Sequence, residues 1–296
     1  MTQKARMDLL GAASLIGLNG VFALNQVAIK LTNLGIGPVF AAGLRSLLAL
    51  GILFAWMWWR GLRPATPRAA WGAGLFLGML FAIEFVLLFQ ALDLTTVSRA
   101  SIVFYSMPIW LALVAHLALP GEQLTPLRGL GLALAMAGVV LALRDPESRA
   151  AGNLWGDLMA LGAALCWMGI ALTVRLTALA KEPPETQLAW QLVISAVVLI
   201  AVAPLFGPIL RDPDWSHWAG LVFQAVFVAS LGFLFWFRLM VVYRASDIAA
   251  FSFLAPVLSA ALGGLLLGEP LGAGFWAAMA LVAVGIVLIN RRTAAA

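Results

Sequence analysis

Long apolar stretches recur along the whole chain, and short polar segments rich in Gly, Pro and charged residues separate them. Most of these stretches hold about twenty residues, which at about 1.5 Å of rise per residue lets a helix cross a hydrocarbon core of about 30 Å. The pattern predicts ten membrane-spanning helices, and no linker is long enough for a separate soluble domain. The expected spans are 8–29, 38–59, 70–92, 100–119, 127–143, 154–179, 186–206, 217–240, 247–267 and 272–290.

Composition agrees with the pattern, because 63% of the residues are hydrophobic and only 10% are charged. The mean hydropathy of +1.01 lies far outside the range of soluble globular proteins. We therefore expect an all-α integral membrane protein. The first span begins like a signal peptide, but it is too long and carries Asn19 and Gln26, so we expect it to be retained as a helix.

The placement of Lys and Arg predicts the orientation, because positively charged loops stay on the cytoplasmic side. With the N-terminus inside, the inner loops and tails hold ten bases and the outer loops hold four. This asymmetry predicts a multi-pass protein of a cell inner membrane with both termini cytoplasmic. The inner bases are Lys4, Arg6, Arg60, Arg63, Arg68, Arg128, Lys181, Arg244, Arg291 and Arg292, and the outer ones are Arg99, Arg144, Arg149 and Arg211.

One short motif occurs twice, as GEQL at Gly121–Leu124 and as GEPL at Gly268–Leu271. The two copies lie 147 positions apart in a chain of 296 residues, so the repeat period is half of the protein. A proline lies inside the apolar stretch that precedes each copy, Pro108 in FYSMPIW and Pro256 in FSFLAPVL. The chain therefore reads as two related halves.

The expected halves are residues 1–148 and 149–296, with five helices each. Because five is odd, the second half enters the membrane from the opposite side, and the repeat is inverted. Inverted repeats give one fold two nearly equivalent packings, each open to one side, with a ligand site near the midplane. The organisation therefore favours a carrier that works by alternating access.

These features resemble the drug/metabolite transporter superfamily, in its EamA-type ten-helix branch. The resemblance covers essentially the whole chain and is carried by the doubled P…GE.L…G signature, by Arg45 in AAGLRSLLA and by the segment FQALDLTTVSRAS. Within the superfamily the chain is most similar to YddG-type exporters of aromatic amino acids, although Asn19-Gly20 stands where the family usually has Trp-Gly. The resemblance implies export of small metabolites.

The repeated Glu and Pro residues have different expected roles. Glu122 and Glu269 lie in turns between helices, where a carboxylate accepts hydrogen bonds from exposed backbone donors, so we expect helix capping rather than substrate contact. Pro108 and Pro256 each remove an intrahelical hydrogen bond and free a carbonyl. In lipid such a carbonyl must face protein or a wet cavity, which makes both prolines candidates for a gating role.

Helical spacing indicates which polar and aromatic side chains line a central cavity. Ser98, Ser101, Tyr105 and Pro108 follow one another by three or four residues and form one polar stripe. The alternative for any such stripe is interhelical hydrogen bonding that holds the bundle together, and for an aromatic residue it is core packing or lipid contact. The candidate substrate-binding residues are Asn19, Gln26, Phe85, Ser101, Tyr105, Trp167, Phe251 and Ser252.

Charges inside a span are costly and usually functional. Glu84 and Arg45 lie at matching depths, roughly 12 Å and roughly 10 Å from the outer ends of their helices. The favoured interpretation is a structural ion pair joined by Lys30. The alternative is a gate or a proton-coupling carboxylate.

Helices five and ten are rich in small residues, which permit close backbone approach: Gly131, Ala135 and Gly138 in one, Gly274 and Ala278 in the other. We expect these two helices to pack on each other or across a homodimer interface rather than to line the path.

Other functional classes have little chemical support. With a single Cys and two remote His, the chain offers no nucleophile-and-base pair and no metal cluster, so we expect no enzyme, no metal and no cofactor. No phosphate-binding glycine loop is present for an ATP-driven pump, and no basic soluble module for nucleic acid. We predict a transporter in the lipid bilayer that exports aromatic or neutral amino acids. The alternatives are a broad-specificity drug or organic-cation exporter and a facilitative, pore-like channel.

Overall fold

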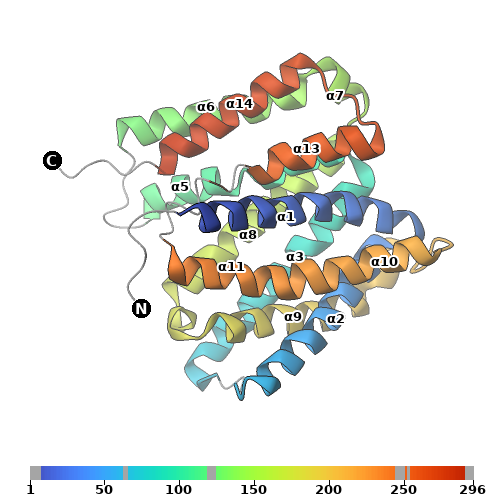
Figure 1. The fold of residues 1–296 in the computed structure, drawn as a ribbon, viewed down its shortest axis with the longest axis vertical. Coiled ribbons are helices and arrows are strands. Elements are labelled where there is room, and N and C mark those ends of the chain that lie inside the picture. Colours follow the sequence, from blue (N-terminus) through green and yellow to red (C-terminus); the bar gives the residue numbers. More distant parts are fainter. Residues whose placement is uncertain (1–7, 63–65, 119–124, 244–250, 252–253, 291–296) are drawn as a thin grey trace.

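The computed structural model describes residues 8–62, 66–118, 125–243, 251 and 254–290, and they are almost entirely helical, without a β-strand (Figure 1). The helices are α1 (Leu9–Gly35), α2 (Pro38–Trp59), η1 (Arg68–Ala70), α3 (Trp71–Leu94), α4 (Val97–Phe104), α5 (Met107–Ala118), α6 (Pro126–Arg144), α7 (Pro146–Ala150), α8 (Leu154–Leu176), η2 (Ala178–Lys181), α9 (Pro184–Val202), η3 (Ala203–Phe206), α10 (Trp215–Phe223), η4 (Gln224–Ser230), α11 (Leu231–Val242), α13 (Leu254–Leu267) and α14 (Ala273–Asn290).

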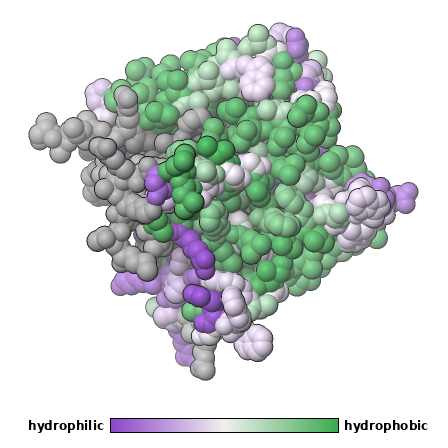
Figure 2. Space-filling model, in the orientation of Figure 1, coloured by the Kyte–Doolittle hydropathy of each residue, from purple (hydrophilic) through white to green (hydrophobic). Residues whose placement is uncertain are grey.

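The ten predicted spans are confirmed in the part of the chain that the structure describes. Eight helices or helix runs are long and apolar enough to cross a membrane, and α13 and α14 supply two shorter apolar ones. Figure 2 shows the same property on the surface, where a broad hydrophobic band covers the middle of the visible face and hydrophilic residues gather toward its two ends. The first described helix starts, and the last one ends, at the same end of the bundle (Figure 1).

Helices of the two halves pair with each other. The central helix α3 packs on α8 and α9, α2 packs on α9, and both α1 and α4 pack on α13. Since every one of these contacts joins the first half to the second, the two halves share one core. Any site between them is therefore built from both.

Span four is broken, whereas the sequence predicted one continuous helix. Helix α4 ends at Phe104 and α5 begins at Met107. Pro108 explains the break, because it has no N–H to donate and its ring would clash with the Phe104 carbonyl of a continuous helix. Ser106 holds the corner, since its hydroxyl donates to the Val103 carbonyl at 2.6 Å and accepts from Trp110 Nε1 at 3.0 Å.

Span eight also departs from a regular α-helix, because its middle is the seven-residue π-helix η4. The Leu231 N–H bonds the Val226 carbonyl, five residues back, and the Ser230 hydroxyl donates to the Ala225 carbonyl at 2.8 Å. A π-segment inside a long helix is often found at a functional site. Because this span contains no proline, the sequence did not predict the π-segment.

Helix α10 begins with a capping box that the sequence did not reveal. The Asp214 carboxylate accepts from the Ser216 and His217 backbone N–H groups, and His217 Nδ1 accepts from the Asp214 N–H at 3.0 Å. Hydrogen bonds from the side chain and backbone of Ser216 hold the pKa of Asp214 below its usual value. His217 and Asp214 together therefore stabilise the start of this helix.

Helices α6 and α14 pack tightly on each other, at the upper edge of the molecule in Figure 1, as one of the two predicted arrangements had it. A Cβ on Gly138 would lie 2.7 Å from the Ala278 carbonyl oxygen, and one on Gly285 would lie 2.5 Å from the Gly131 carbonyl oxygen. The backbones touch because the small residues leave no side chain between them.

Candidate functional site

An aromatic cluster lies where α4 and α8 meet, beside the break in span four. The Trp167 ring stacks on Phe104 at 5.0 Å between centroids, and it meets Tyr105 edge-on at 6.0 Å. The Tyr105 hydroxyl in turn interacts with the Gln26 side chain of α1. Three of the predicted substrate-binding residues, from both halves, are thus brought together.

Several buried polar atoms on α1, α4 and α13 have no hydrogen-bond partner among the described residues. They include Gln26 Oε1 and the hydroxyl oxygens of Ser101 on α4 and Ser259 on α13. Helix α13 packs on both α1 and α4, so these atoms belong to one group of helices. An unsatisfied buried polar group is costly, and a bound ligand or water that supplied a partner would remove that cost.

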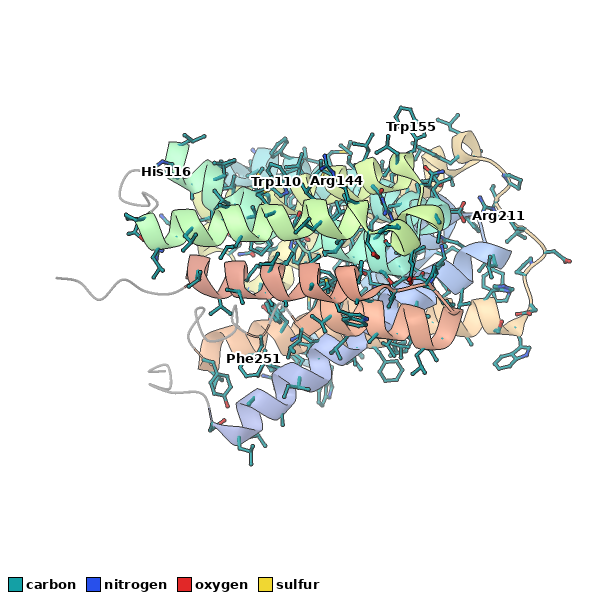
Figure 3. All side chains as sticks on the ribbon, turned by 90° about the horizontal axis from the view of Figure 1, so that it is seen from above. Trp110, His116, Arg144, Trp155, Arg211 and Phe251 are labelled. Atoms are coloured by element: carbon teal, nitrogen blue, oxygen red, sulfur yellow. The ribbon has the colours of Figure 1, made fainter. Side chains whose placement is uncertain are left out.

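The other predicted substrate residues lie elsewhere or have local partners. Asn19 donates to the Leu15 carbonyl of its own helix at 2.7 Å. Phe251 packs beside a separate small core that includes Leu15 and Tyr243, and it lies toward the His116 end of the molecule in Figure 3. Ser252 is outside the described residues, and so is Glu122. Pro256 is the third residue of α13.

Phe85 belongs to a second group, with Arg45 of α2 and Glu84 of α3. The guanidinium of Arg45 lies over the Phe85 ring, 3.7 Å from its centroid, and 5.2 Å from that of Phe89. Arg45 and Glu84 are 1% and 4% exposed and interact electrostatically. No ion pair joins them at contact distance in the part of the chain that the structure describes.

Lys30 does not join this pair, contrary to expectation. Its ammonium donates to the Leu92 carbonyl at 3.0 Å and to the Thr95 carbonyl at 2.6 Å, and so it caps the C-terminal end of α3. The carboxylates that act on it electrostatically are those of Glu269 and Asp93. A cation suits the negative end of a helix dipole, which explains the placement.

Glu269 caps a helix, but a different one from the helix that follows it. Its carboxylate accepts from the Val97 N–H at 2.6 Å, the Ser98 N–H at 3.0 Å and the Ser98 hydroxyl at 2.6 Å. These donors form the start of α4, in the other half of the chain. The carboxylate thus connects the two halves.

Two ion pairs at the same end also join the halves, and the sequence did not reveal them. Arg99 donates to both carboxylate oxygens of Asp157, and both side chains are buried. Arg211 donates to both oxygens of Asp93, at 2.8 and 3.0 Å. The sequence placed Arg99 and Arg211 in outer loops. Opposite charges at span ends were the available signal, but pairing them needs the packing of the halves.

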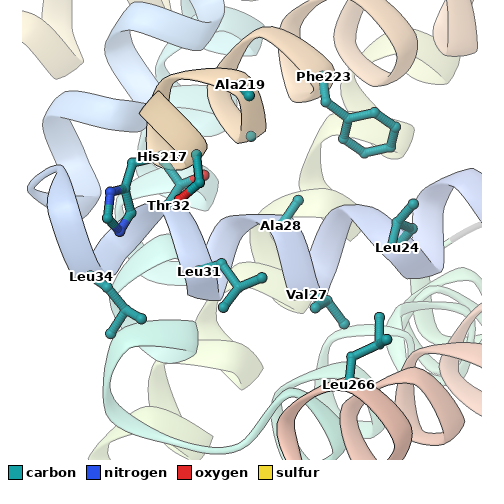
Figure 4. A pocket seen from close by; sticks show the side chains of 12 residues that line it. Leu24, Val27, Ala28, Leu31, Thr32, Leu34, His217, Ala219, Phe223 and Leu266 are labelled. Atoms are coloured by element: carbon teal, nitrogen blue, oxygen red, sulfur yellow. The ribbon is translucent and has the colours of Figure 1, made fainter. Parts of the chain in front are cut away.

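Two surface pockets, of about 410 and 400 Å³, are each lined partly by α1. The first is formed mainly with α10 and is lined by apolar side chains such as Leu24, Leu31 and Phe223, with Thr32 and His217 at its polar end (Figure 4). The second lies against η4 and α11. None of the predicted substrate-binding residues lines either pocket, so both are separate from the cluster between the halves.

The family model for EamA-like transporters matches this chain twice, over residues 9–144 and residues 154–291. The chain belongs to the EamA-like transporter family. It is therefore a multi-pass membrane transporter, built as the two-repeat, ten-helix fold of that family.

Relatives and a solved structure agree with this assignment. The chain is 26% identical over 266 residues to "Uncharacterized transporter YvbV" of Bacillus subtilis, which covers 87% of this chain and 84% of that protein. It is 26% identical over 264 residues to "Probable amino-acid metabolite efflux pump" of Escherichia coli, covering 85% of each. A crystal structure with 24% identity superposes with a TM-score of 0.68 over 94% of this chain and 96% of that one, which supports the fold alone.

Proposed function

We propose that this EamA-family transporter is a secondary carrier that exports small neutral amino acids, aromatic ones above all, across the cell inner membrane. The observation that carries the proposal is the cluster of Tyr105 and Trp167 beside Gln26 and Ser101. It combines aromatic faces with buried polar atoms that have no partner among the described residues. A ligand with one aromatic group and a few polar atoms fits such a lining.

The contacts between the halves support alternating access. Glu269, Asp157 and Arg211 of the second half bond to the first half at one end of the bundle. Positive-inside counting makes this end the outer one. The carrier is then closed toward the outside in this conformation, and release of substrate outward requires these bonds to separate.

The name of the Escherichia coli relative supports the substrate class, and the resemblance to YddG-type exporters supports the direction. The alternative is a drug or organic-cation exporter, and a direct flux measurement decides between it and an amino-acid exporter. Reconstitution into liposomes gives that measurement.

The test is counterflow in proteoliposomes loaded with unlabelled phenylalanine and given labelled phenylalanine outside. We expect saturable uptake that internal phenylalanine accelerates, because a carrier returns faster when loaded. Replacing Trp167 by Ala should slow this exchange at least fivefold, whereas Trp155→Ala, at the exposed start of α8, should leave it unchanged. Flux that does not saturate would indicate a channel. Exchange of organic cations but not of amino acids would show that the substrates are organic cations.

A further inference from the structure

Arg45 and Glu84 are two buried ionic groups of opposite sign that do not satisfy each other. The Nε and Nη2 atoms of Arg45 and the Oε2 atom of Glu84 have no hydrogen-bond partner among the described residues. Both side chains are more than nine-tenths buried, at 1% and 4% exposure. A structural ion pair in such surroundings forms direct hydrogen bonds, because unpaired buried charges are strongly destabilising.

The stacking of Arg45 on Phe85 determines which part of the guanidinium is available. With the carbon of the guanidinium 3.7 Å from the ring centroid, one face of the group is covered. Stacking leaves the N–H groups at the edge free to donate, and this edge matches the two oxygens of a carboxylate. The aromatic ring therefore holds Arg45 without using its donors.

Three other charged residues that lie between the halves have hydrogen-bond partners of their own. Lys30 bonds to carbonyls at the end of α3, Asp157 binds Arg99, and Glu269 caps α4. Among the residues that the structure describes, Glu84 is the carboxylate that acts electrostatically on Arg45, and Arg45 is the base that acts on Glu84. The two residues thus present one isolated positive and one isolated negative group to the same region.

The geometry points to a binding site for a zwitterion, in which Arg45 receives a carboxylate and Glu84 receives an ammonium group. This inference rests on the proposed function and deepens it, because an α-amino acid carries both groups on one carbon. Cys166 of α8 lies within electrostatic range of Glu84, and its neighbour in the chain is Trp167 of the aromatic cluster. The site is closed to solvent in this conformation, so a ligand reaches it when the halves move apart.

The first test uses the unmodified protein and a matched set of ligands: phenylalanine, phenethylamine, which lacks the carboxylate, and 3-phenylpropionate, which lacks the ammonium group. Binding is measured in detergent by the shift in unfolding temperature and by tryptophan fluorescence. We expect phenylalanine to bind at least tenfold more tightly than either analogue. Binding of either analogue within threefold of phenylalanine would overturn the zwitterion site.

The second test assigns each group to one residue. In Arg45→Gln, phenethylamine should bind at least as well as phenylalanine, because the carboxylate has lost its partner. In Glu84→Gln, 3-phenylpropionate should gain relative to phenylalanine for the corresponding reason. The matched controls are Arg60→Gln, at an exposed arginine near the Trp56 ring, and Asp212→Asn, at an exposed acid, and both should keep the wild-type preference.

A purely structural role would give a different result. The variants would then lower the unfolding temperature and keep the ligand preference of the wild type, which overturns the inference. If a variant does not fold, the binding of the three ligands to the wild-type protein decides whether the zwitterion site exists. Counterflow separates this inference from the proposed function. Transport of phenylalanine by a protein that does not prefer zwitterions would contradict only the zwitterion site. Binding of zwitterions by a protein that does not transport them would contradict only the proposed function.

Discussion

At the residue scale, the Arg99–Asp157 pair combines deep burial with direct hydrogen bonds, as Arg45 and Glu84 do not. Arg99 also donates to the Leu143 carbonyl at 3.0 Å, so its guanidinium has three acceptor groups around it once Ser148 is counted. Breaking a buried pair leaves one charge uncompensated, which costs more than the pair contributes. Stability at this end of the bundle should therefore depend strongly on this pair.

We expect Asp157→Asn to lower the free energy of unfolding by about 3–5 kcal/mol, because Arg99 would stay buried without its anion. Arg211→Met is the matched control. It breaks the more exposed Arg211–Asp93 pair, and loss of a solvent-screened pair costs about 1 kcal/mol. Denaturant unfolding in detergent micelles measures both. Equal losses for the two variants would show that the Arg99–Asp157 pair is not specially dependent on burial.

Gly263 on α13 leaves the space that Glu269 occupies. A Cβ at this position would lie 2.6 Å from Glu269 Oε2 and 3.2 Å from the Ser98 hydroxyl oxygen, so Gly263→Ala pushes the carboxylate away from the start of α4. Loss of a helix cap costs about 1–2 kcal/mol, and we expect a destabilisation of that size. Gly264→Ala is the control, since its Cβ would lie 3.1 Å from the flexible Leu271 side chain and at an ordinary contact distance of 3.6 Å from the Glu269 carbonyl oxygen. A larger effect at Gly264 would argue against the cap.

The capping role of Glu269 illustrates what could be inferred at this scale. A carboxylate in a turn after an apolar helix predicts a cap, and the structure contains one. The helix that it caps could not be inferred, because Ser98 lies 171 positions away and only the packing of α13 on α4 brings it near. The same holds for Lys30, which was expected to join Arg45 and Glu84 but donates instead to carbonyls at the end of α3.

At the element scale, the small residues of α6 and α14 gave the most specific correct inference. Spacings of three and four residues predicted that these helices pack closely, and the backbones of Gly138 and Ala278 indeed touch. The break after α4 was predicted only in part. Pro108 predicted the loss of one backbone hydrogen bond, but it did not predict that the helix would end. The π-helix η4 was not predicted at all, because a π-segment depends on side-chain contacts such as that of Ser230 and not on a proline or glycine.

Replacing Gly138 by Val tests the contact between α6 and α14. The new side chain would collide with the Ala278 carbonyl and with Val282, and overpacking of this kind costs about 1–3 kcal/mol. Gly129→Val on the same helix is the control, because nothing lies within 4 Å of a Cβ there. Both variants carry the same helix propensity change, so the difference between their unfolding free energies isolates the packing. Equal unfolding free energies for the two variants would show that the contact between α6 and α14 does not contribute to stability.

At the scale of the whole molecule, hydrophobic spacing was enough to predict ten spans and an all-helical membrane fold. The doubled Gly-Glu motif predicted two related halves, and the family model matches the chain twice. The sequence could not predict which end of the bundle is closed in this structure, because that depends on where hydrogen bonds and ion pairs join the two halves. Those bonds involve residues that are far apart in the sequence and that only tertiary packing brings together.

Opposite insertion of the two halves makes a prediction about two corresponding positions. Leu10 and Trp155 lie at the starts of the first helix in each half and are 75% and 69% exposed. Because five spans separate them, they should face opposite sides of the membrane. In a Cys166→Ser background, a membrane-impermeant maleimide added to intact cells should label Trp155→Cys at once, and Leu10→Cys only after permeabilisation. The order depends on the positive-inside orientation, so a reversed pattern would invert the molecule but keep the opposed halves. Labelling of both positions from the same side would contradict the inverted repeat, and with it the two symmetric packings on which alternating access depends.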